Sequence, residues 1–356
     1  MFASAAFPGH SISSFSFLYF LLNLPGGDIA RANADYVNTV WVLARQMSSV
    51  TSQEVPGWNG FISETGVRPA KLTSIDYYPV INKPITEYTT VKECLRVSEQ
   101  ATREVGCQEY VITTFDLGVC MKAYPLIWTK PGYEKHIIMI GSFHLIGAYL
   151  KAIGKKMKDS GIHEVLLEAE LTTPGSLTGI IDGKNYARAM FCHKTVLEGL
   201  ERLLLRKFNQ NPQGMAAAKM RKLLENRSKE NLEEVLQDSA VTKLVDDYEK
   251  FKNEVRRGKL GKTAQLWITY MDHIWLVLRL ILSVKTNNFE LYQACTYQMR
   301  GLFFAFNGQN YARYLTFFST FLANLDESHP GGSDLLRAGA ISVARSFVPG
   351  IYLFDI

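Results

Sequence analysis

The chain has 356 residues, of which 47% are hydrophobic and 12% aromatic, so it can bury large cores and has the length of two or three domains. Its formal net charge of +5 would favour a polyanionic partner but is too small to identify one. The five cysteines are far apart and form no Cys-x-x-Cys pair. This pattern excludes zinc-finger spacing and favours a reducing compartment inside the cell, nuclear or cytoplasmic.

Two apolar segments resemble membrane elements by composition. Residues 15–24 form a run that is too short to span a bilayer and has no Lys or Arg before it, so we expect a buried helix or strand and no signal peptide. Residues 266–284 are longer, but Asp272, His273 and Arg279 interrupt them. These charges favour a core helix over a membrane span, and no membrane partner is predicted.

The chain divides by pattern into an N-terminal layer, an α/β region and an all-α region. Residues 1–70 are predicted to be helical and irregular, with a helix over residues 28–49. Residues 71–171 alternate between strand-like and helical patterns, which predicts a mainly parallel sheet with helical cover. Residues 172–345 show helical periodicity almost throughout, and residues 346–356 are predicted to return to the α/β core.

Within the α/β region the elements are short. Residues 89–105 and the pattern from Leu145 to Met157 predict amphipathic helices. Two β-branched runs, residues 110–115 and 136–141, predict buried strands. Residues 72–79 are strand-like, and residues 163–171 weakly favour a further strand because apolar residues alternate there.

Polar side chains follow the two predicted buried strands. Asp116 ends the first strand, and the second runs through Gly141 to His144. Ligands of open α/β sheets collect at the carboxyl ends of strands, so Asp116 and His144 are candidates for one site. The structural alternative is that Asp116 is a helix cap or turn residue and that His144 is a structural histidine.

A short sequence occurs twice in the second half of the chain. Asn185-Tyr186-Ala187-Arg188 recurs as Asn310-Tyr311-Ala312-Arg313, each time after a glycine-containing turn and before a predicted helix. A repeated helix start explains this pattern, since Asn caps helices. The functional alternative is that Arg188 and Arg313 face a phosphate-rich ligand such as nucleic acid, because Arg binds phosphate bidentately.

A set of short motifs is spread along the chain. They are Tyr77-Tyr78-Pro79, Phe115-Asp116, Gly141-Ser142-Phe143-His144, Gly154-Lys155-Lys156, Asp182 to Arg188, His193, Trp267 to Met271 and Asn310 to Arg313. On these residues the chain resembles a group of transposon-derived reading frames of cnidarians, molluscs and other animals. More distantly, it resembles cut-and-paste transposases of the Mutator-like and hAT-like kinds. The likeness implies an α/β half with a ribonuclease-H-like mixed sheet and a large all-α insertion-like C-terminal half.

The resemblance also implies a catalytic site for DNA strand cleavage and transfer. Asp76 and Asp116 would hold two Mg²⁺ or Mn²⁺ ions, which prefer carboxylate oxygens. His144 would bind the scissile phosphate or, as the simpler role, orient Asp116. The sequence has Gly141 where the transposase motif has Cys or Asp.

Two metal ions need a third acid, and the sequence offers three explanations for it. Glu168 or Glu170 would supply it, or it would lie beyond the end of the chain, or the protein would be an inactive relic. The last of these is preferred to Glu168 or Glu170, and we expect a truncated gene product. Serine-hydrolase and nucleotide-binding motifs are absent. The alternative function is a noncatalytic helical protein that binds other proteins or DNA.

Overall fold

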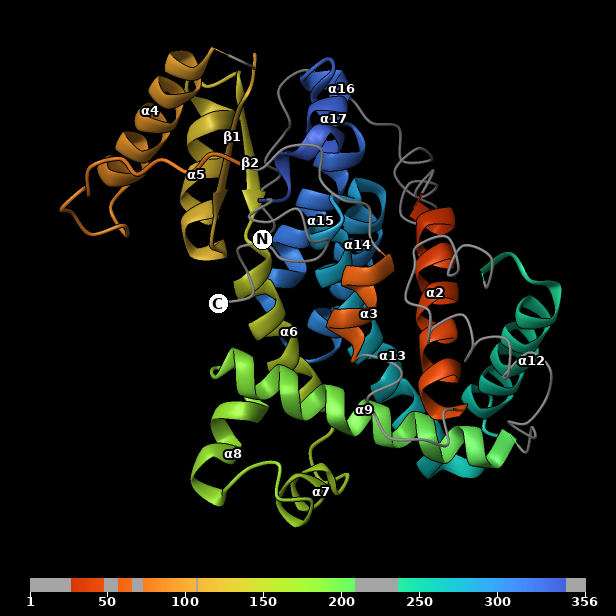
Figure 1. Ribbon diagram of the computed structural model, residues 1–356. Helices are drawn as coiled ribbons and strands as arrows, with labels where there is room; N and C mark the ends of the chain where they lie inside the picture. The colour runs from red at the N-terminus through yellow and green to blue at the C-terminus, as the bar shows by residue number, and fades with distance from the viewer. Residues whose placement is uncertain (1–26, 48–56, 66–72, 107, 209–235, 344–356) are drawn as a thin grey trace.

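The computed structural model describes residues 27–47, 57–65, 73–106, 108–208 and 236–343. In this part of the chain one small sheet lies at one end of a mainly helical structure, next to α4 and α5 (Figure 1). Three parts of the sequence predictions lie outside these ranges. They are the apolar run at residues 15–24, residues 209–235 of the predicted all-α region, and the predicted return to the core over residues 346–356.

The sheet is a single βαβ unit. β1 (Val111–Phe115) and β2 (His136–Ile140) pair in parallel, with Val111 opposite His136. α5 (Leu117–Thr129) forms the crossover that parallel strands require. Every residue of β2 is buried, as its unbroken apolar sequence predicts. Both strands predicted around Asp116 and Gly141 are confirmed.

The predicted ribonuclease-H-like mixed sheet is wrong, because the described residues contain a sheet of two strands only. Residues 73–79 are extended and exposed, with Tyr77 92% exposed, and pair with no strand in the described chain. Residues 163–171 form most of α7 (Ile162–Glu168) and a turn. Ile162 and Leu166 supply the buried face of α7 at helical spacing, and this outweighs the alternation that favoured a strand.

The remaining regular elements of the described chain are helices. Their bounds are α2 Gly27–Met47, α3 Trp58–Thr65, α4 Tyr88–Val105, α6 Ser142–Lys156, α8 Pro174–Ile181, α9 Tyr186–Phe208, α12 Ser239–Arg256, α13 Gly261–Lys285, α14 Phe289–Ala305, α15 Gln309–Ala323, α16 Leu325–Ser328 and α17 Gly332–Leu335, followed by the π-helical turn η1 Leu336–Ala340.

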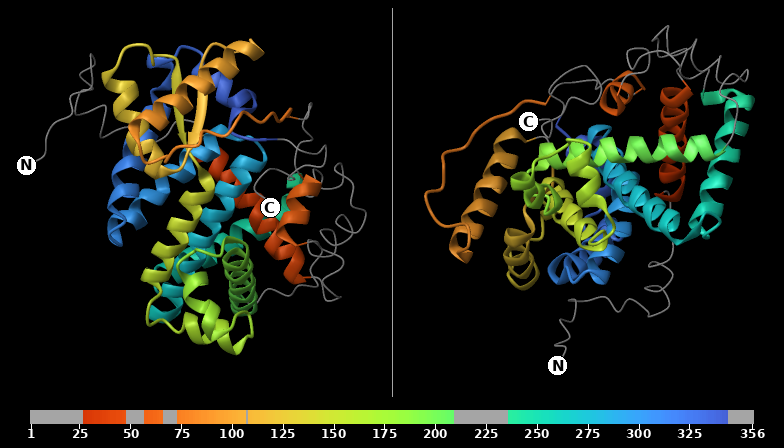
Figure 2. Two further views of the ribbon diagram at one scale, coloured as in Figure 1. Left: turned by 90° about the vertical axis from the view of Figure 1, so that its left-hand side faces the viewer. Right: turned by 90° about the horizontal axis from the view of Figure 1, so that it is seen from below.

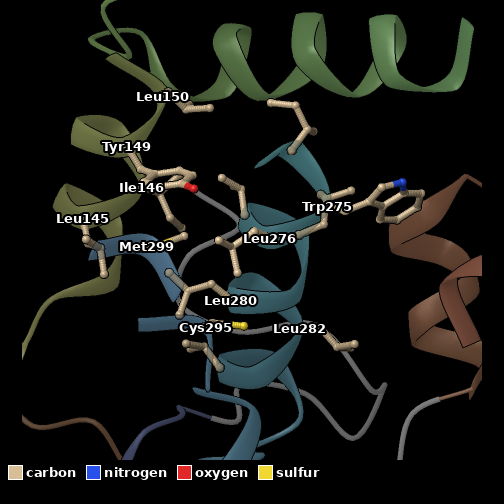
Figure 3. Close-up of a cluster of buried hydrophobic side chains, with 14 of the residues drawn as sticks. Leu145, Ile146, Tyr149, Leu150, Trp275, Leu276, Leu280, Leu282, Cys295 and Met299 are labelled. Atoms are coloured by element: carbon tan, nitrogen blue, oxygen red, sulfur yellow. The ribbon is translucent and has the colours of Figure 1, made fainter. Parts of the chain in front are cut away.

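α13 is the central helix, in contact with α6, α9, α12 and α14. Leu145 and Tyr149 of α6 pack with Leu276 and Leu280 of α13 in the same buried cluster as Met299 of α14 (Figure 3). By length and composition α13 could cross a membrane, but 67% of its most apolar 18-residue window is buried inside the protein. Such burial is typical of a core helix.

One cluster of buried side chains runs through the α/β region and the helical region. α6 links them, because it starts at the end of β2 and packs on α13 and α14. The left panel of Figure 2 shows the sheet above, α6 running down from it, and α7 and α8 at the lower end of α6. The carboxyl ends of the strands therefore lie where the sheet meets the helices.

Candidate functional site

The carboxyl ends of β1 and β2 open into a crevice of about 710 Å³. Asp116 follows β1, and His144 lies in the first turn of α6, directly after β2. Both side chains line this crevice. Its third wall is the turn between α14 and α15, which contributes residues 307–311. The structure therefore brings the Asp and the His together at the strand ends and adds a wall from a segment far along the chain.

Asp116 is the N-cap of α5. Its Oδ1 accepts a hydrogen bond of 2.8 Å from the backbone N–H of Val119, which is the usual arrangement for a capping aspartate. The side chain is exposed to the crevice. Asp116 thus has the structural role that the sequence allowed, while its carboxylate still faces the crevice.

α6 starts without a side-chain cap. Its N-cap is Gly141, whose N–H donates to the carbonyl oxygen of Phe115 at 2.8 Å. A Cβ atom at Gly141 would lie 3.2 Å from that oxygen, so the close approach of the two strand ends favours glycine. Because no side chain caps α6, its first-turn N–H groups and its positive dipole end remain available beside His144.

Helix α15, which follows the turn after α14, also starts without a side-chain cap. Gly308 is the N-cap of α15, and no side chain caps this helix. Asn307 has a φ of 62°, and a Cβ atom at Gly308 would lie 2.6 Å from the ring of Phe303. The turn is therefore tight, and it presents Gln309, Asn310 and the start of a second uncapped helix to the crevice.

Tyr311 forms the inner part of this wall. Its ring stacks on that of Phe303 with the ring centroids 4.8 Å apart. Burial, and then the negative charge of Asp116, raises the pKa of Tyr311 to about 12. The phenol therefore stays protonated at neutral pH and is a hydrogen-bond donor or acceptor, not a base.

Asp76 and Glu170 do not line the crevice. Asp76 lies in the exposed segment before α4. Glu170 follows α7 and has a φ of 53° and an exposed side chain. Helix α7 adjoins the C-terminal end of α6 (Figure 1). His144, which lines the crevice, lies at the N-terminal end of α6.

The residues around Asp116 do not fit the two-metal site that the resemblance implied. Within the described ranges, no group of three or more His, Cys, Asp or Glu side chains is placed to hold a metal ion. Two Mg²⁺ ions held for phosphodiester cleavage need several carboxylates in one place. Of the three predicted acids, Asp116 alone lines the crevice.

Arg188 and Arg313 lie on the outer surfaces of α9 and α15 and do not line the crevice. The guanidinium of Arg188 lies 5.2 Å from the ring of Phe191, and that of Arg313 lies 5.5 Å from the ring of Tyr314. Each arginine thus contacts an aromatic ring of its own helix, and both side chains are exposed.

The repeated Asn-Tyr-Ala-Arg sequence does begin two helices, but in different registers. Oδ1 of Asn185 accepts a bond of 3.4 Å from the N–H of Arg188 at the start of α9. In the second copy the helix starts two residues earlier relative to the motif, at Gln309 directly after Gly308. Tyr311 lines the crevice with His144, while Tyr186 lines a separate cavity with Phe143. The second copy of the repeat contributes Asn310 and Tyr311 to the third wall of the crevice. The repeat was therefore the one feature of the sequence that drew attention to this wall.

A row of basic side chains, absent from the sequence predictions, runs from the crevice along α6. Lys151 lies seven residues after His144, and Lys155 lies four residues after Lys151. These helical spacings place all three side chains on the outer face of α6. Each is exposed. Nζ of Lys155 also donates to the carbonyl oxygen of Phe306, at 3.3 Å, beside the turn that closes the crevice. We call His144, Lys151 and Lys155 the α6 basic row.

A family model described as a domain of unknown function (DUF8702) matches residues 57–347. The chain belongs to this family. The DUF8702 match includes the βαβ unit, α6, both copies of the repeat and all walls of the crevice. Neither a curated protein nor a solved structure matches the chain.

Proposed function

We propose that this protein binds the phosphate backbone of a nucleic acid along the crevice and the α6 basic row, and that it does so without cleaving the strand. The observation that carries the proposal is the row itself, which places His144, Lys151 and Lys155 on one exposed helix face that opens from the crevice. The ammonium groups of Lys151 and Lys155, one helical turn apart, match neighbouring charges of a phosphate backbone, and the imidazole of His144 adds a hydrogen-bonding group.

The crevice supplies the second kind of phosphate contact. The N-termini of α6 and α15 both adjoin it without a side-chain cap. Free first-turn N–H groups and the positive end of a helix bind phosphate oxygens in many proteins. Asn310 and Gln309 add side-chain amides, which donate to phosphate or sugar oxygens.

Strand cleavage is not part of the proposal. It would need carboxylates that hold metal ions beside Asp116, and the acids expected for this purpose, Asp76 and Glu170, lie outside the crevice. Asp116 itself is engaged as the cap of α5. The arrangement therefore favours the noncatalytic alternative of the sequence predictions.

The test is fluorescence anisotropy with a labelled DNA duplex of about 20 base pairs, titrated at salt concentrations from about 50 to about 200 mM. Replacing Lys151 and Lys155 together with alanine removes two phosphate contacts. The slope of log affinity against log salt concentration should then fall by about 2, and affinity at low salt should drop at least tenfold, or about 1.4 kcal/mol.

The matched control replaces Lys92 and Lys243 with alanine. These lysines are exposed on α4 and α12, away from the crevice, so the control removes the same net charge. If the control lowers affinity and salt slope as much as the α6 variant does, binding follows net charge alone and the proposed site is wrong. Absence of binding to duplex or single-stranded DNA would also overturn the proposal.

A further inference from the structure

A seam between α5 and α15 leads away from the crevice. Leu117 and Met121 of α5 line the crevice, and Tyr124 and Trp128 follow them along the helix. The spacings of four, three and four residues place these four side chains on one face of α5. Helices α5 and α15 contact each other, so this face can be followed from the crevice to the packed rings of the two helices.

The facing side of α15 starts at the same crevice. Asn310 lines the crevice, and Tyr314 and Phe317 follow it at spacings of four and three residues. The ring of Tyr314 stacks on that of Tyr124 with the centroids 6.1 Å apart, and the ring of Trp128 stacks on Tyr124 from α5 itself at 5.3 Å. The ring of Phe317 lies edge-on to that of Trp128 at 4.4 Å. We call Tyr124, Trp128, Tyr314 and Phe317 the α5–α15 aromatic seam.

The aromatic seam is only partly covered. Tyr124 is 1% exposed and forms its floor, whereas Trp128 is 38% exposed, and Tyr314 and Phe317 are half-buried. Packing of the fold accounts for Tyr124, but a group of apolar rings that reaches the surface is typical of a binding surface. Flat rings suit the flat faces of nucleobases, because every base has a π-face that can stack on an aromatic side chain.

The charge of the two helices fits a nucleic acid. Neither α5 nor α15 contains an Asp or Glu residue, and Asp116 lies at the opposite end of α5 from Trp128. The exposed guanidinium of Arg313 lies 5.5 Å from the ring of Tyr314, and the exposed Lys130 directly follows α5. An arginine beside an aromatic ring attracts phosphate and adds a cation–π contact to a stacked base.

The aromatic seam and the α6 basic row extend from the crevice in opposite directions. Helix α5 returns from the crevice along the sheet as the crossover between β1 and β2, whereas α6 runs away from the sheet (Figure 1). Seam, crevice and row therefore form one track, with aromatic rings at one end and ammonium groups at the other.

We infer that the α5–α15 aromatic seam stacks the bases of a single-stranded nucleic acid whose phosphates lie in the crevice and along the α6 basic row. In a duplex the bases are paired and stacked on one another, so their faces cannot reach Trp128. The inference rests on the proposed function, to which it adds a preference for single strands over duplexes.

The first test uses the unaltered protein and fluorescence anisotropy at about 100 mM salt. The probes are a labelled oligothymidylate of about 12 nucleotides, an abasic strand of the same length, and the duplex of the oligothymidylate with oligoadenylate. The oligothymidylate should bind at least about fivefold more tightly than the abasic strand, as expected for one stacked base, and more tightly than the duplex, although the duplex carries more charge. Equal binding of the oligothymidylate and either other probe would overturn the inference and leave the backbone-binding proposal in place.

Variants then locate the bases. Trp128→Leu keeps an apolar side chain against Tyr124 and removes the indole. It should weaken binding of the oligothymidylate at least about fivefold and leave binding of the abasic strand and the duplex unchanged. Replacing Lys151 and Lys155 together with alanine should instead weaken binding of all three probes, because it removes phosphate contacts. The two sets of variants therefore separate the inference from the proposed function.

The matched control is Phe191→Leu. Phe191 is 48% exposed on α9 and has the guanidinium of Arg188 5.2 Å from its ring, so it has the same kind of aromatic–arginine pair outside the track. This variant should bind the oligothymidylate as the parent does. If Trp128→Leu also binds as the parent does, or weakens binding of all three probes by the same factor, the bases do not stack on the aromatic seam and the inference fails.

Discussion

The hydroxyl group of Tyr270 lies 2.8 Å from Nδ1 of His193, and both side chains are fully buried between α9 and α13. A second pair of the same kind joins α6 to α13, with the hydroxyl of Tyr149 2.8 Å from Nδ1 of His273. Burial lowers the pKa of His193 to about 4. Burial, with a smaller effect from the charge of Lys156, also lowers the pKa of His273 to about 4.

These pairs predict a loss of stability in acid. A histidine of the unfolded chain has a pKa of about 6.5, so between pH 6.5 and pH 4 the unfolded state binds more protons than the folded state. The free energy of unfolding should be highest above pH 6.5 and fall as the pH approaches 4, by about 3 kcal/mol for each histidine. Urea unfolding at a series of pH values measures this slope.

The variant His193→Phe identifies the source of the slope. In this variant the unfolded state should bind about one proton fewer relative to the folded state than in the parent. The free energy of unfolding of the variant should therefore fall less steeply as the pH is lowered. Leu203→Ala, at an exposed position of the same helix, changes no titratable group, so it serves as the control and should keep the parent slope. An unchanged slope in His193→Phe would show that the Tyr270 pair does not control acid stability.

The carboxylate of Glu201 is buried in a polar network, so the stability of the fold should depend strongly on this side chain. It is 1% exposed and accepts hydrogen bonds from the hydroxyl of Tyr248 at 2.7 Å and from Nε1 of Trp275 at 2.9 Å. Nζ of the buried Lys252 lies 3.7 Å away. Burial alone would lower the pKa of Lys252, but the carboxylates of Glu201 and Glu249 outweigh it and raise the pKa.

Replacing Glu201 with alanine should therefore destabilise the protein by about 3–5 kcal/mol, since it leaves a buried ammonium group and two buried donors without this acceptor. The control is Glu254→Ala, which breaks the exposed ion pair with Lys259 and should cost about 0–1 kcal/mol. Denaturant unfolding of both variants tests the difference. Equal losses would mean that Glu201 contributes no more than a surface charge.

Two glycines predict opposite effects of alanine. Gly183 has a φ of 67°, and a Cβ atom there would lie 2.3 Å from the carbonyl oxygen of Gly147 in α6. Gly183→Ala should cost about 2 kcal/mol or more, because it adds backbone strain and a steric clash. Gly199 lies inside α9 with open space around it, so Gly199→Ala should stabilise by about 0.5–1 kcal/mol. Thermal unfolding distinguishes the two, and destabilisation of equal size in both would contradict this account.

Variants of Asp116 test whether this side chain caps α5 or binds a metal ion. Asp116→Ala should cost about 1 kcal/mol of stability through loss of the hydrogen bond to Val119, whereas Asp116→Asn should cost less because the amide oxygen also caps. With Mg²⁺ present, the parent and both variants should leave a DNA duplex intact. Cleavage by the parent that Asp116→Asn abolishes would instead establish Asp116 as a metal ligand.

Local pattern was sufficient to predict the elements near the crevice. The β-branched runs before Asp116 and Gly141 formed the two predicted strands, and helical periodicity over residues 172–345 predicted the region that contains α9, α13 and α14. Side-chain periodicity and chain connection also implied that Asp116 and His144 would meet, because parallel strands joined by one crossover end at the same edge. The sequence also allowed Asp116 to be a helix cap, because capping depends only on residues next to it in the chain.

The extent of the sheet and the completion of the crevice were decided by tertiary packing. A run such as residues 73–79 becomes a strand only if another strand pairs with it, and no local signal records that partner. The wall formed by Asn307 to Tyr311 reaches His144 because α14 and α15 fold back on α6 and α5. The sequence alone thus determined which side chains stand at the strand ends. Long-range contacts determined that, among the described residues, these side chains face two uncapped helices and the α6 basic row.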